Sequence, residues 1–376
     1  MKKNKTIILS LILIMGVAFT ACSRGVRGER TNLIRDGKTI TVIEDSKDEQ
    51  RKDELSLIGI EKHEDIRFMD WLDGDTILVT KDNTELGKIP VEDSKAYPKN
   101  LYYYSLDSEK IRKITSESYF HGFASFSPDK KHIFFKKHLE ETAKGYIIDA
   151  DGKNEIEITA REHYIGVYNG RWLDNESVIY STISGDIFVA DINKNLSEIE
   201  KPSTGYIYDV FKSQGKIYYI TGERDLKVLD LRDMDDKSTS GDNTTLYSDV
   251  SRMFPSADNS KAALIKINED GKLQLVVVDF EGSTQKVIAE GSDITGISWS
   301  PDQSMLAYCI MSENDAKSGI YISRLDSGKS SQVLANMEFV PDPIGWSPSG
   351  KKIAATQIDI VEGEYRNITY IIGIKD

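Results

Sequence analysis

Short apolar stretches alternate with polar turns along most of this chain, and the same order of residues recurs. In Ile297–Tyr308, ISWSPDQSMLAY, the apolar residues end at a tryptophan, Ser-Pro-Asp follows, and a second apolar run begins. Residues Ile344–Ala355, IGWSPSGKKIAA, repeat that order. Alternating apolar residues are typical of half-buried strands, and Ser, Pro, Asp and Gly favour tight reversals. Each copy therefore predicts a strand, a turn and a second strand.

The pattern occurs seven times, with one position marking the end of each first strand: Trp71, Phe126, Trp172, Phe211, Pro255, Trp299 and Trp346. Successive positions lie 39 to 55 residues apart, which brackets the ~40–45-residue period of four-stranded propeller blades. The copy at Phe211 is one residue shorter in its turn. Third and fourth strands follow, as in GYIIDAD and EIEITA. The sequence predicts an all-β, seven-bladed β-propeller over residues 66–376, and six to eight blades fit the spacing.

Two further strand-like segments precede the repeats, within residues 31–65. They are Lys38–Asp45, KTITVIED, and Glu54–Lys62, ELSLIGIEK. The last repeat shows only three clear strands before the sequence ends. We therefore expect one of these two segments to supply the missing outer strand and to close the ring.

The repeats also resemble a known family. FSPDKKHIFF, WSPDQSMLAY and WSPSGKKIAA, with IIDADGKNEIEIT completing a blade, are similar to the WD40-like repeats of TolB-type propellers. The resemblance covers about residues 65–376 and implies the same fold. It does not imply one function, because this architecture carries scaffolds, lectins and enzymes alike.

The N-terminus is typical of a secretion signal: MKKNK is basic, and Ile7–Phe19 is a short apolar run. Phe19-Thr20-Ala21-Cys22 resembles the lipobox of bacterial lipoproteins, although Phe19 stands where Leu is usual. The resemblance implies a signal peptide over residues 1–21, cleavage before Cys22, acylation of its thiol, and a tether over residues 22–30. The protein would then sit on the extracytoplasmic side of the cell membrane. An ordinary signal peptide and an uncleaved anchor are the alternatives.

The net charge bears on the class of partner, and the cysteine count bears on disulfide bonding. The net charge of −13 disfavours nucleic acid as a partner, because phosphate binding needs a basic footprint. Cys309 is the only cysteine besides Cys22, and it lies in the apolar run MLAYCI. We expect a buried, inert thiol and no disulfide within the propeller.

Signatures of catalysis are missing from the sequence. It has no Gly-x-Ser-x-Gly elbow, no Gly-rich phosphate loop and no Cys/His pair with zinc spacing. We therefore predict no catalytic, cofactor or metal residues, and we expect a protein that is not an enzyme.

The loops that enter each first strand should gather on the face opposite the Ser-Pro-Asp turns. Aromatic and histidine residues are concentrated in these loops: Tyr119, Phe120, His121, His163, Tyr164, Tyr168, Tyr206 and Tyr208. Tyr-rich loops suit the recognition of proteins or sugars. We expect a non-catalytic platform that binds a protein or a glycan of the cell envelope.

An enzyme is the competing hypothesis. His121, His163 and Glu162 would then carry acid–base or metal roles in a lyase or hydrolase that acts on envelope glycans or small metabolites.

Overall fold

The computed structural model describes residues 29–35, 38–44, 55–91, 94–138, 142–199, 205–230, 244–280, 285–312, 317–335, 342–361 and 364–375. The chain divides into two units, Met1–Lys52 and Asp53–Asp376. In the first unit, β1 (Glu29–Arg35) and β2 (Lys38–Glu44) form an antiparallel hairpin. The expected signal peptide and Cys22 lie outside the described residues. The part of the chain that the structure describes contains no helical segment with the length and apolar character of a membrane span.

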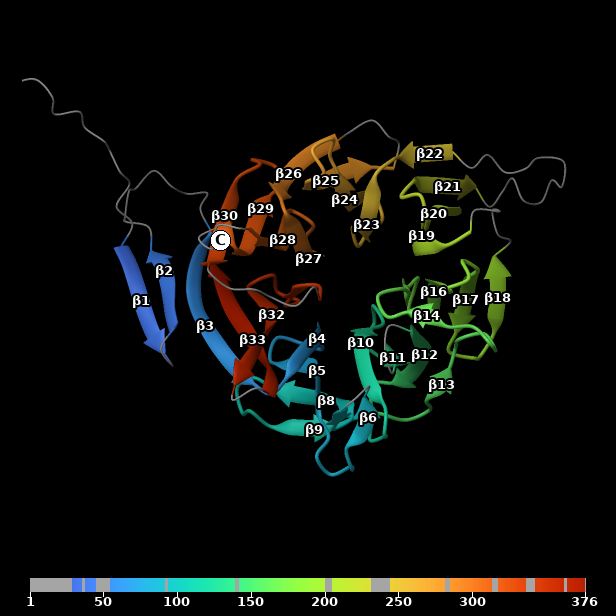
Figure 1. Ribbon diagram of the computed structural model, residues 1–376, viewed down its shortest axis with the longest axis horizontal. Coiled ribbons are helices and arrows are strands. Elements are labelled where there is room, and N and C mark those ends of the chain that lie inside the picture. The colour runs from blue at the N-terminus through green and yellow to red at the C-terminus, as the bar shows by residue number, and fades with distance from the viewer. Residues whose placement is uncertain are drawn as a thin grey trace, which may run out of the picture. The chain divides into compact units, whose positions relative to one another are not determined.

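Seven antiparallel sheets form a ring in the second unit, which confirms the predicted seven-bladed propeller (Figure 1). Blades one to three contain β4 (Arg67–Trp71), β5 (Thr76–Asp82), β8 (Lys99–Ser105) and β9 (Ile111–Lys113); β10 (Phe120–Phe126), β11 (His132–His138), β12 (Thr142–Asp149), β13 (Ile156–Glu157) and β14 (Ile165–Gly166); and β15 (Arg171–Trp172), β16 (Ser177–Ser181), β17 (Ile187–Asp191) and β18 (Leu196–Ile199). Blades four and five contain β19 (Ile207–Ser213), β20 (Lys216–Thr221), β21 (Leu226–Asp230) and β22 (Thr244–Tyr247); and β23 (Val250–Pro255), β24 (Lys261–Ile267), β25 (Leu273–Asp279) and β26 (Gln285–Gly291). Blades six and seven contain β27 (Asp293–Trp299), β28 (Met305–Met311), β29 (Gly319–Arg324) and β30 (Ser330–Ala335); and β31 (Gly345–Trp346), β32 (Lys352–Val361), β33 (Glu364–Lys375) and β3 (Ser56–Glu64). A small hairpin, β6 (Ile89–Val91) and β7 (Ser94–Ala96), is inserted between β5 and β8.

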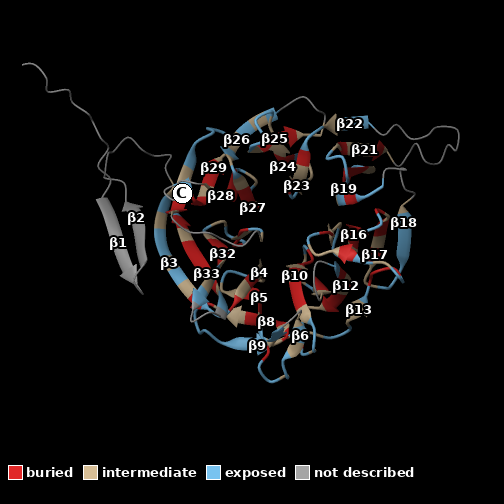
Figure 2. Ribbon diagram, viewed as in Figure 1, coloured by how far each residue is buried: buried red, intermediate tan, exposed pale blue. Residues whose placement is uncertain are grey.

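The core lies between neighbouring blades. Successive side chains of a strand point to opposite faces of its sheet, so each blade buries apolar residues against the blade on either side. On β11, Phe134 packs with Tyr180 of blade three, whereas Phe135 packs with Leu101 of blade one. Cys309 is buried in β28, as the sequence predicts. Buried positions accordingly concentrate on the middle strands, and outer strands such as β18 are mostly exposed (Figure 2).

All four tryptophans bind the preceding blade in the same way. Each indole N–H donates to a backbone carbonyl of that blade's first strand, one residue before the position that corresponds to the tryptophan. The pairs are Trp71 with Gly345 (2.9 Å), Trp172 with Ser125 (3.1 Å), Trp299 with Phe254 (2.9 Å) and Trp346 with Ser298 (3.3 Å). The repeated aromatic therefore joins blades by a directed hydrogen bond as well as by apolar contact.

The turn after the first strand is built around a buried serine in four blades. The serine hydroxyl accepts a hydrogen bond from the backbone N–H of the first residue of the second strand. These pairs are Ser127 with His132 (3.0 Å), Ser256 with Lys261 (3.1 Å), Ser300 with Met305 (2.9 Å) and Ser347 with Lys352 (3.0 Å). The serine, followed by Pro-Asp in two of these turns, thus fixes a five-residue reversal, which is the structural meaning of the repeat.

Blade four departs from this pattern, and the interpretation of Phe211 as a strand-ending residue is wrong. Strand β19 continues to Ser213, and a two-residue turn follows, Gln214-Gly215, with φ of 49° and 76°. Two positive φ values are typical of the tightest hairpin turns. Phe211 instead packs between blades four and five, stacked on Tyr218 with 4.7 Å between ring centroids and grouped with Met253 of blade five.

A segment from the N-terminal side closes the ring, as expected. β3 pairs antiparallel with β33, so blade seven has the order β3-β33-β32-β31. The predicted segment Glu54–Lys62 supplies this strand, whereas Lys38–Asp45 contributes β2 to the separate hairpin. The Thr369 hydroxyl also donates to the Ile66 carbonyl (2.8 Å), which ties blade seven to the chain entering blade one.

Removing the closing strand should destabilise the whole ring. Deletion of residues 55–64 removes the backbone hydrogen bonds between β3 and β33. We expect the unfolding temperature to fall by at least about 5 °C. Calorimetry of the full chain measures this. The control is Ile58→Ala on the same strand, where the side chain is 67% exposed, and we expect no shift. An unchanged unfolding temperature after the deletion would contradict the role of β3 in closure.

The indole hydrogen bonds should contribute measurably to stability. Trp71→Phe removes the donor, leaves the Gly345 carbonyl without it, and opens space in the core, so we expect a loss of about 2–4 kcal/mol in the free energy of unfolding. Urea denaturation measures the loss. Tyr365→Phe, at a side chain that is 78% exposed, should change stability by less than about 0.5 kcal/mol. Equal effects of the two substitutions would argue against a special role of the indole.

Candidate functional site

The face opposite the Ser-Pro-Asp turns is formed by the loops that enter the first strands and by the turns after the second strands. Backbone hydrogen bonds join the two sets: Ile183 N–H donates to the Tyr164 carbonyl (2.9 Å), and Gly222 N–H donates to the Tyr206 carbonyl (2.9 Å). We call this face the mouth. The strand directions place it as the sequence predicts.

Five exposed tyrosines occupy the mouth on blades two to four. They are Tyr119, Tyr164, Tyr168, Tyr206 and Tyr208, with exposed fractions of 38% to 51%; we call them the tyrosine crescent. Among the described residues only one other aromatic side chain, Tyr365, is comparably exposed. Exposed aromatic side chains that cluster are a common feature of binding surfaces, so their concentration in adjacent loops makes the crescent the candidate recognition surface.

Two contacts fix the orientation of rings in the crescent. Tyr206 and Tyr208 meet edge to face, with 4.7 Å between centroids. The Lys144 ammonium lies 4.7 Å from the centroid of the Tyr164 ring. Both arrangements are favourable for aromatic rings, and they leave much of each ring open to solvent.

The structure does not place His121 on the mouth surface. Its side chain is 1% exposed, its Nδ1 lies 2.7 Å from the Thr115 hydroxyl, and its ring packs on Phe135. The alternation of β10 directs it between blades one and two, where burial lowers its pKa below the usual value despite the nearby Glu117. Phe120 is also partly buried and packs on the His138 ring. Both residues therefore serve packing at the edge of the predicted site.

His163 remains partly exposed and belongs to a different environment. Its ring meets Phe188 edge to face, and its Nδ1 lies 3.7 Å from an Asp186 carboxylate oxygen. The hypothetical acid–base set of His121, His163 and Glu162 is thus split between a core position and two surface positions. Among the described residues, no three His, Cys, Asp or Glu side chains are grouped to hold a metal ion.

Sequence reasoning missed a second group of residues, which surrounds the axis of the ring. First strands lie nearest the centre (Figure 1), and charged or aromatic residues on or beside them contact one another across several blades. Arg67 of blade one lies over the Phe123 ring of blade two (5.7 Å), and Phe123 meets Tyr168 at the entrance to blade three (5.0 Å). Tyr168 in turn lies under Arg252 of blade five (5.1 Å). A contact between blades three and five, which are not neighbours, places these side chains at the axis.

Ion pairs complete this group. Arg67 donates from Nε and from a terminal nitrogen to the two oxygens of Asp342, both at 2.6 Å. One terminal nitrogen of Arg171 lies 2.5 and 2.7 Å from the oxygens of Asp209. We define the axial cluster as Arg67, Phe123, Lys136, Tyr168, Arg171, Asp209, Arg252 and Asp342.

A signal in the sequence could have found part of the cluster. Arg67, Tyr168 and Asp342 each stand four residues before the strand-ending tryptophan of their blade, where apolar or small residues occur in other blades. A charged or large aromatic residue at a position that holds Gly122, Ile207, Ser251 or Thr295 in the other blades is the departure that marks them.

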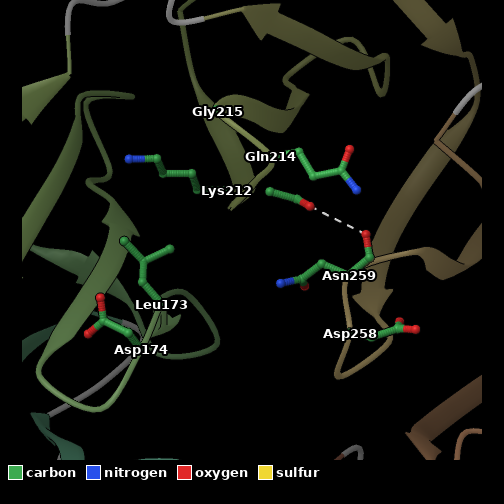
Figure 3. Close-up of a pocket in the computed structure, with 8 residues that line it drawn as sticks. Leu173, Asp174, Lys212, Gln214, Gly215, Asp258 and Asn259 are labelled. Atoms are coloured by element: carbon green, nitrogen blue, oxygen red, sulfur yellow. Dashed lines mark hydrogen bonds between the residues drawn. The ribbon is translucent and has the colours of Figure 1, made fainter.

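A separate pocket of about 360 Å³ lies at the opposite end of blades three to five (Figure 3). It is lined by the turns of these blades, where the short Gln214-Gly215 turn leaves room between its neighbours. The Ser213 hydroxyl donates to the Asn259 carbonyl across it (3.3 Å). Its carboxylates already cap their own turns: Asp174 accepts from the Ser177 N–H (2.7 Å), and Asp258 from the Ser256 hydroxyl (2.7 Å). The pocket is therefore a consequence of turn length, and the mouth is the stronger candidate site.

Comparison with known proteins supports the fold. No family model matches the chain. Solved structures that it resembles include an oligogalacturonate lyase in complex with manganese, at 11% identity and a TM-score of 0.60, covering 94% of this chain and 99% of that one. They also include the WD40 β-propeller domain of Doa1, at 13% identity and a TM-score of 0.53, covering 85% and 97%. TolB from Acinetobacter baumannii is similar at 17% identity and a TM-score of 0.47, covering 69% and 63%.

The expectation that this chain is not an enzyme is contradicted by the first of these structures, because a lyase has the same architecture over almost its whole length. At 11% identity the likeness shows the fold alone. A WD40 domain shares that fold as well. What the comparisons establish is a β-propeller fold that a lyase and a WD40 domain share, an architecture that carries both binding and catalysis.

Proposed function

We propose that this protein is a lipid-anchored, extracytoplasmic propeller that binds a glycan of the cell envelope at its mouth. The observation that carries the proposal is the tyrosine crescent, which holds five of the six exposed aromatic side chains among the described residues. Tyrosine offers an apolar ring face to the C–H groups of a sugar and a hydroxyl to its oxygens. Because tyrosine loses little conformational freedom on binding, such a surface suits an extended, polar ligand.

The rigidity of the scaffold supports recognition at the crescent. Its loops are held by backbone hydrogen bonds to neighbouring turns, such as Ile183 N–H to the Tyr164 carbonyl. Binding surfaces on rigid supports spend less free energy on ordering when the ligand arrives. A glycan lying across blades two to four would therefore meet rings that are already oriented.

The lipid anchor rests on the resemblance of Phe19–Cys22 to a lipobox. One acyl chain alone gives only marginal membrane binding, whereas several chains on one N-terminus hold a protein stably. The anchor would keep the propeller at the membrane, where its ligand is an envelope glycan rather than a diffusing solute.

Cleavage of the bound glycan is the second candidate function, and the likeness to an oligogalacturonate lyase over 94% of the chain favours it. Such a reaction leaves an unsaturated product that absorbs in the ultraviolet. Binding experiments with uronate oligosaccharides should therefore be followed by absorbance, so that a lyase is recognised if one is present.

Loss of the acylated thiol should release the protein. With Cys22→Ala we expect the protein to move from the membrane fraction to the soluble extracytoplasmic fraction, because the lipid attachment atom is gone. Fractionation and immunoblotting measure this. Cys309→Ala is the matched control, since that thiol is buried in β28, and it should leave the protein in the membrane fraction. Continued membrane retention of Cys22→Ala would argue against the lipid anchor.

Glycan binding should depend on the crescent. We expect Tyr206→Ala together with Tyr208→Ala to weaken binding to an immobilised set of neutral and uronate oligosaccharides by at least about tenfold, which corresponds to about 1.4 kcal/mol. Val287→Ala, which alters an exposed apolar residue on the outer strand β26, should leave binding unchanged. If no glycan binds, or if both variants bind like the native chain, the proposed function is wrong.

A further inference from the structure

The axial cluster is unusually cationic for this protein. It contains Arg67, Lys136, Arg171 and Arg252 but only two carboxylates, Asp209 and Asp342, in a chain whose net charge is −13. Each carboxylate is already paired with one arginine, Asp342 with Arg67 and Asp209 with Arg171. The charges of Lys136 and Arg252 are therefore left without a partner of opposite sign within the cluster.

Lys136 is the least expected of these residues. Its side chain is 3% exposed. Its ammonium lies 4.6 Å from the Phe134 ring centroid and 5.9 Å from that of Phe123, and the structure gives it no hydrogen bond to the residues it describes. A buried charge normally carries a paired ion or a full set of hydrogen bonds, because its removal from water is costly. The surroundings of Lys136 offer aromatic faces instead.

A second unpaired donor points to the same place. The Nε of Arg171 is buried and has no hydrogen-bond partner, while a terminal nitrogen of the same guanidinium is bound to Asp209. The guanidinium still keeps contact with solvent, since 30% of the Arg171 side chain is exposed. Buried unpaired donors in native structures are rare and call for an explanation.

Phe123 lies beside Lys136, and its backbone is strained. Its φ is 50°, in the left-handed region that bulky residues rarely adopt. The conformation lies within a β-bulge of β10 between Gly122 and Ser125. It places the Phe123 ring against Arg67, Lys136 and Tyr168. Bulges and strained residues concentrate at binding sites, where they aim a side chain.

We propose that the axial cluster is a binding site for a carboxylate, with Lys136, Arg171 and Arg252 as its cationic side chains and Phe123 and Tyr168 as its aromatic walls. A carboxylate supplies the acceptors that the Lys136 ammonium and the Arg171 Nε–H lack, and guanidinium groups match its planar geometry. Arg67 and Asp342 also belong to the cluster, but they already satisfy each other and are not needed to bind the carboxylate.

Tyr168 belongs to both the axial cluster and the tyrosine crescent, so a sugar on the crescent adjoins the carboxylate site. This step rests on the proposed function: it makes the ligand an acidic glycan whose uronate carboxylate enters the axial cluster. Phe123 and Tyr168 then contact the sugar ring, while Lys136, Arg171 and Arg252 bind its carboxylate.

Burial and, to a smaller extent, the charge of Arg171 lower the pKa of Lys136 to about 7, and Asp209 opposes them. Other titratable or charged groups also lie beside this wall: His138, two residues further along β11, and Tyr168 are in ring contact with Phe123, and Arg67 lies over the same ring. A bound carboxylate favours the charged ammonium. Below about pH 7 Lys136 is already charged, so binding needs no proton. Above that pH binding must take up a proton, and affinity should fall by up to about tenfold per pH unit.

Calorimetric titration of the full-length protein in detergent tests the proposal. The probes are a uronate monosaccharide, its neutral parent hexose, and oligosaccharides of each. We expect the uronate sugar to bind, the neutral hexose to bind at least about tenfold more weakly, and uronate affinity to fall between about pH 6 and pH 8.

Substitutions in the axial cluster test whether uronate binding depends on it. Lys136→Met keeps the length of the side chain and should weaken uronate binding at least about tenfold at pH 6 and remove the fall in affinity across pH 7. Arg252→Gln should weaken it by a similar factor while keeping that pH dependence. The matched control is Lys131→Met on the same blade, whose side chain is 76% exposed, and it should bind like the native chain. Arg252→Gln decides the question if Lys136→Met does not fold.

The outcomes separate this inference from the proposed function. If neutral and uronate oligosaccharides bind equally, or if Lys136→Met and Arg252→Gln bind uronate like the native chain, the carboxylate site is wrong and the crescent stands. A different result would support the carboxylate site and contradict the glycan surface. In that case the uronate monosaccharide binds and requires Lys136, but oligosaccharides bind no more tightly than the monosaccharide, and the Tyr206 and Tyr208 substitutions do not change their affinity. If no probe binds, both are overturned.

Discussion

The hydrogen bond from each tryptophan to the preceding blade is the interaction on which the rest of this structure depends. Neighbouring sheets of a propeller meet through apolar side chains, and apolar contact is not directional. An indole N–H that donates to one specific carbonyl, as Trp71 does to Gly345, fixes the position of one blade along the strand direction relative to the next. Buried donors are costly to leave unpaired, so this bond resists sliding of the sheets. Its recurrence at four blades makes the geometry around the axis reproducible.

Reproducible geometry at the axis is what allows distant residues to form one site. Arg67, Phe123, Tyr168 and Arg252 come from blades one, two, three and five, yet each contacts the next. A change in the register or spacing of neighbouring blades would therefore alter several of these contacts at once. The inter-blade bonds and the β3–β33 pairing therefore support the site without touching it.

The sequence was informative about the scaffold because each blade repeats the same physical solution. A strand-ending aromatic, Ser-Pro-Asp turn residues and alternating apolar residues are local features that predicted the seven blades, and the missing fourth strand of the last repeat predicted closure by an N-terminal strand. Blade four was misread at Phe211 because a two-residue Gln214-Gly215 turn replaces the longer turn without changing the apolar pattern. His121 was misplaced for a related reason: loop position alone does not show which way a side chain at the start of a strand points.

The axial cluster escaped prediction because its meaning lies in contacts between blades rather than in spacing along the chain. Its members break the rules that the repeats obey elsewhere: Lys136 is a buried charge, Arg171 keeps an unpaired Nε–H, and Phe123 adopts a left-handed backbone. Each departure reduces stability, since an apolar residue at position 136 would pack in the same space without the cost of burying a charge. Three departures in unrelated places would be ordinary imperfections of a large fold. Their convergence on one point at the ring axis, where solvent still reaches Arg171 and Tyr168, is what distinguishes a binding site from a poorly packed core.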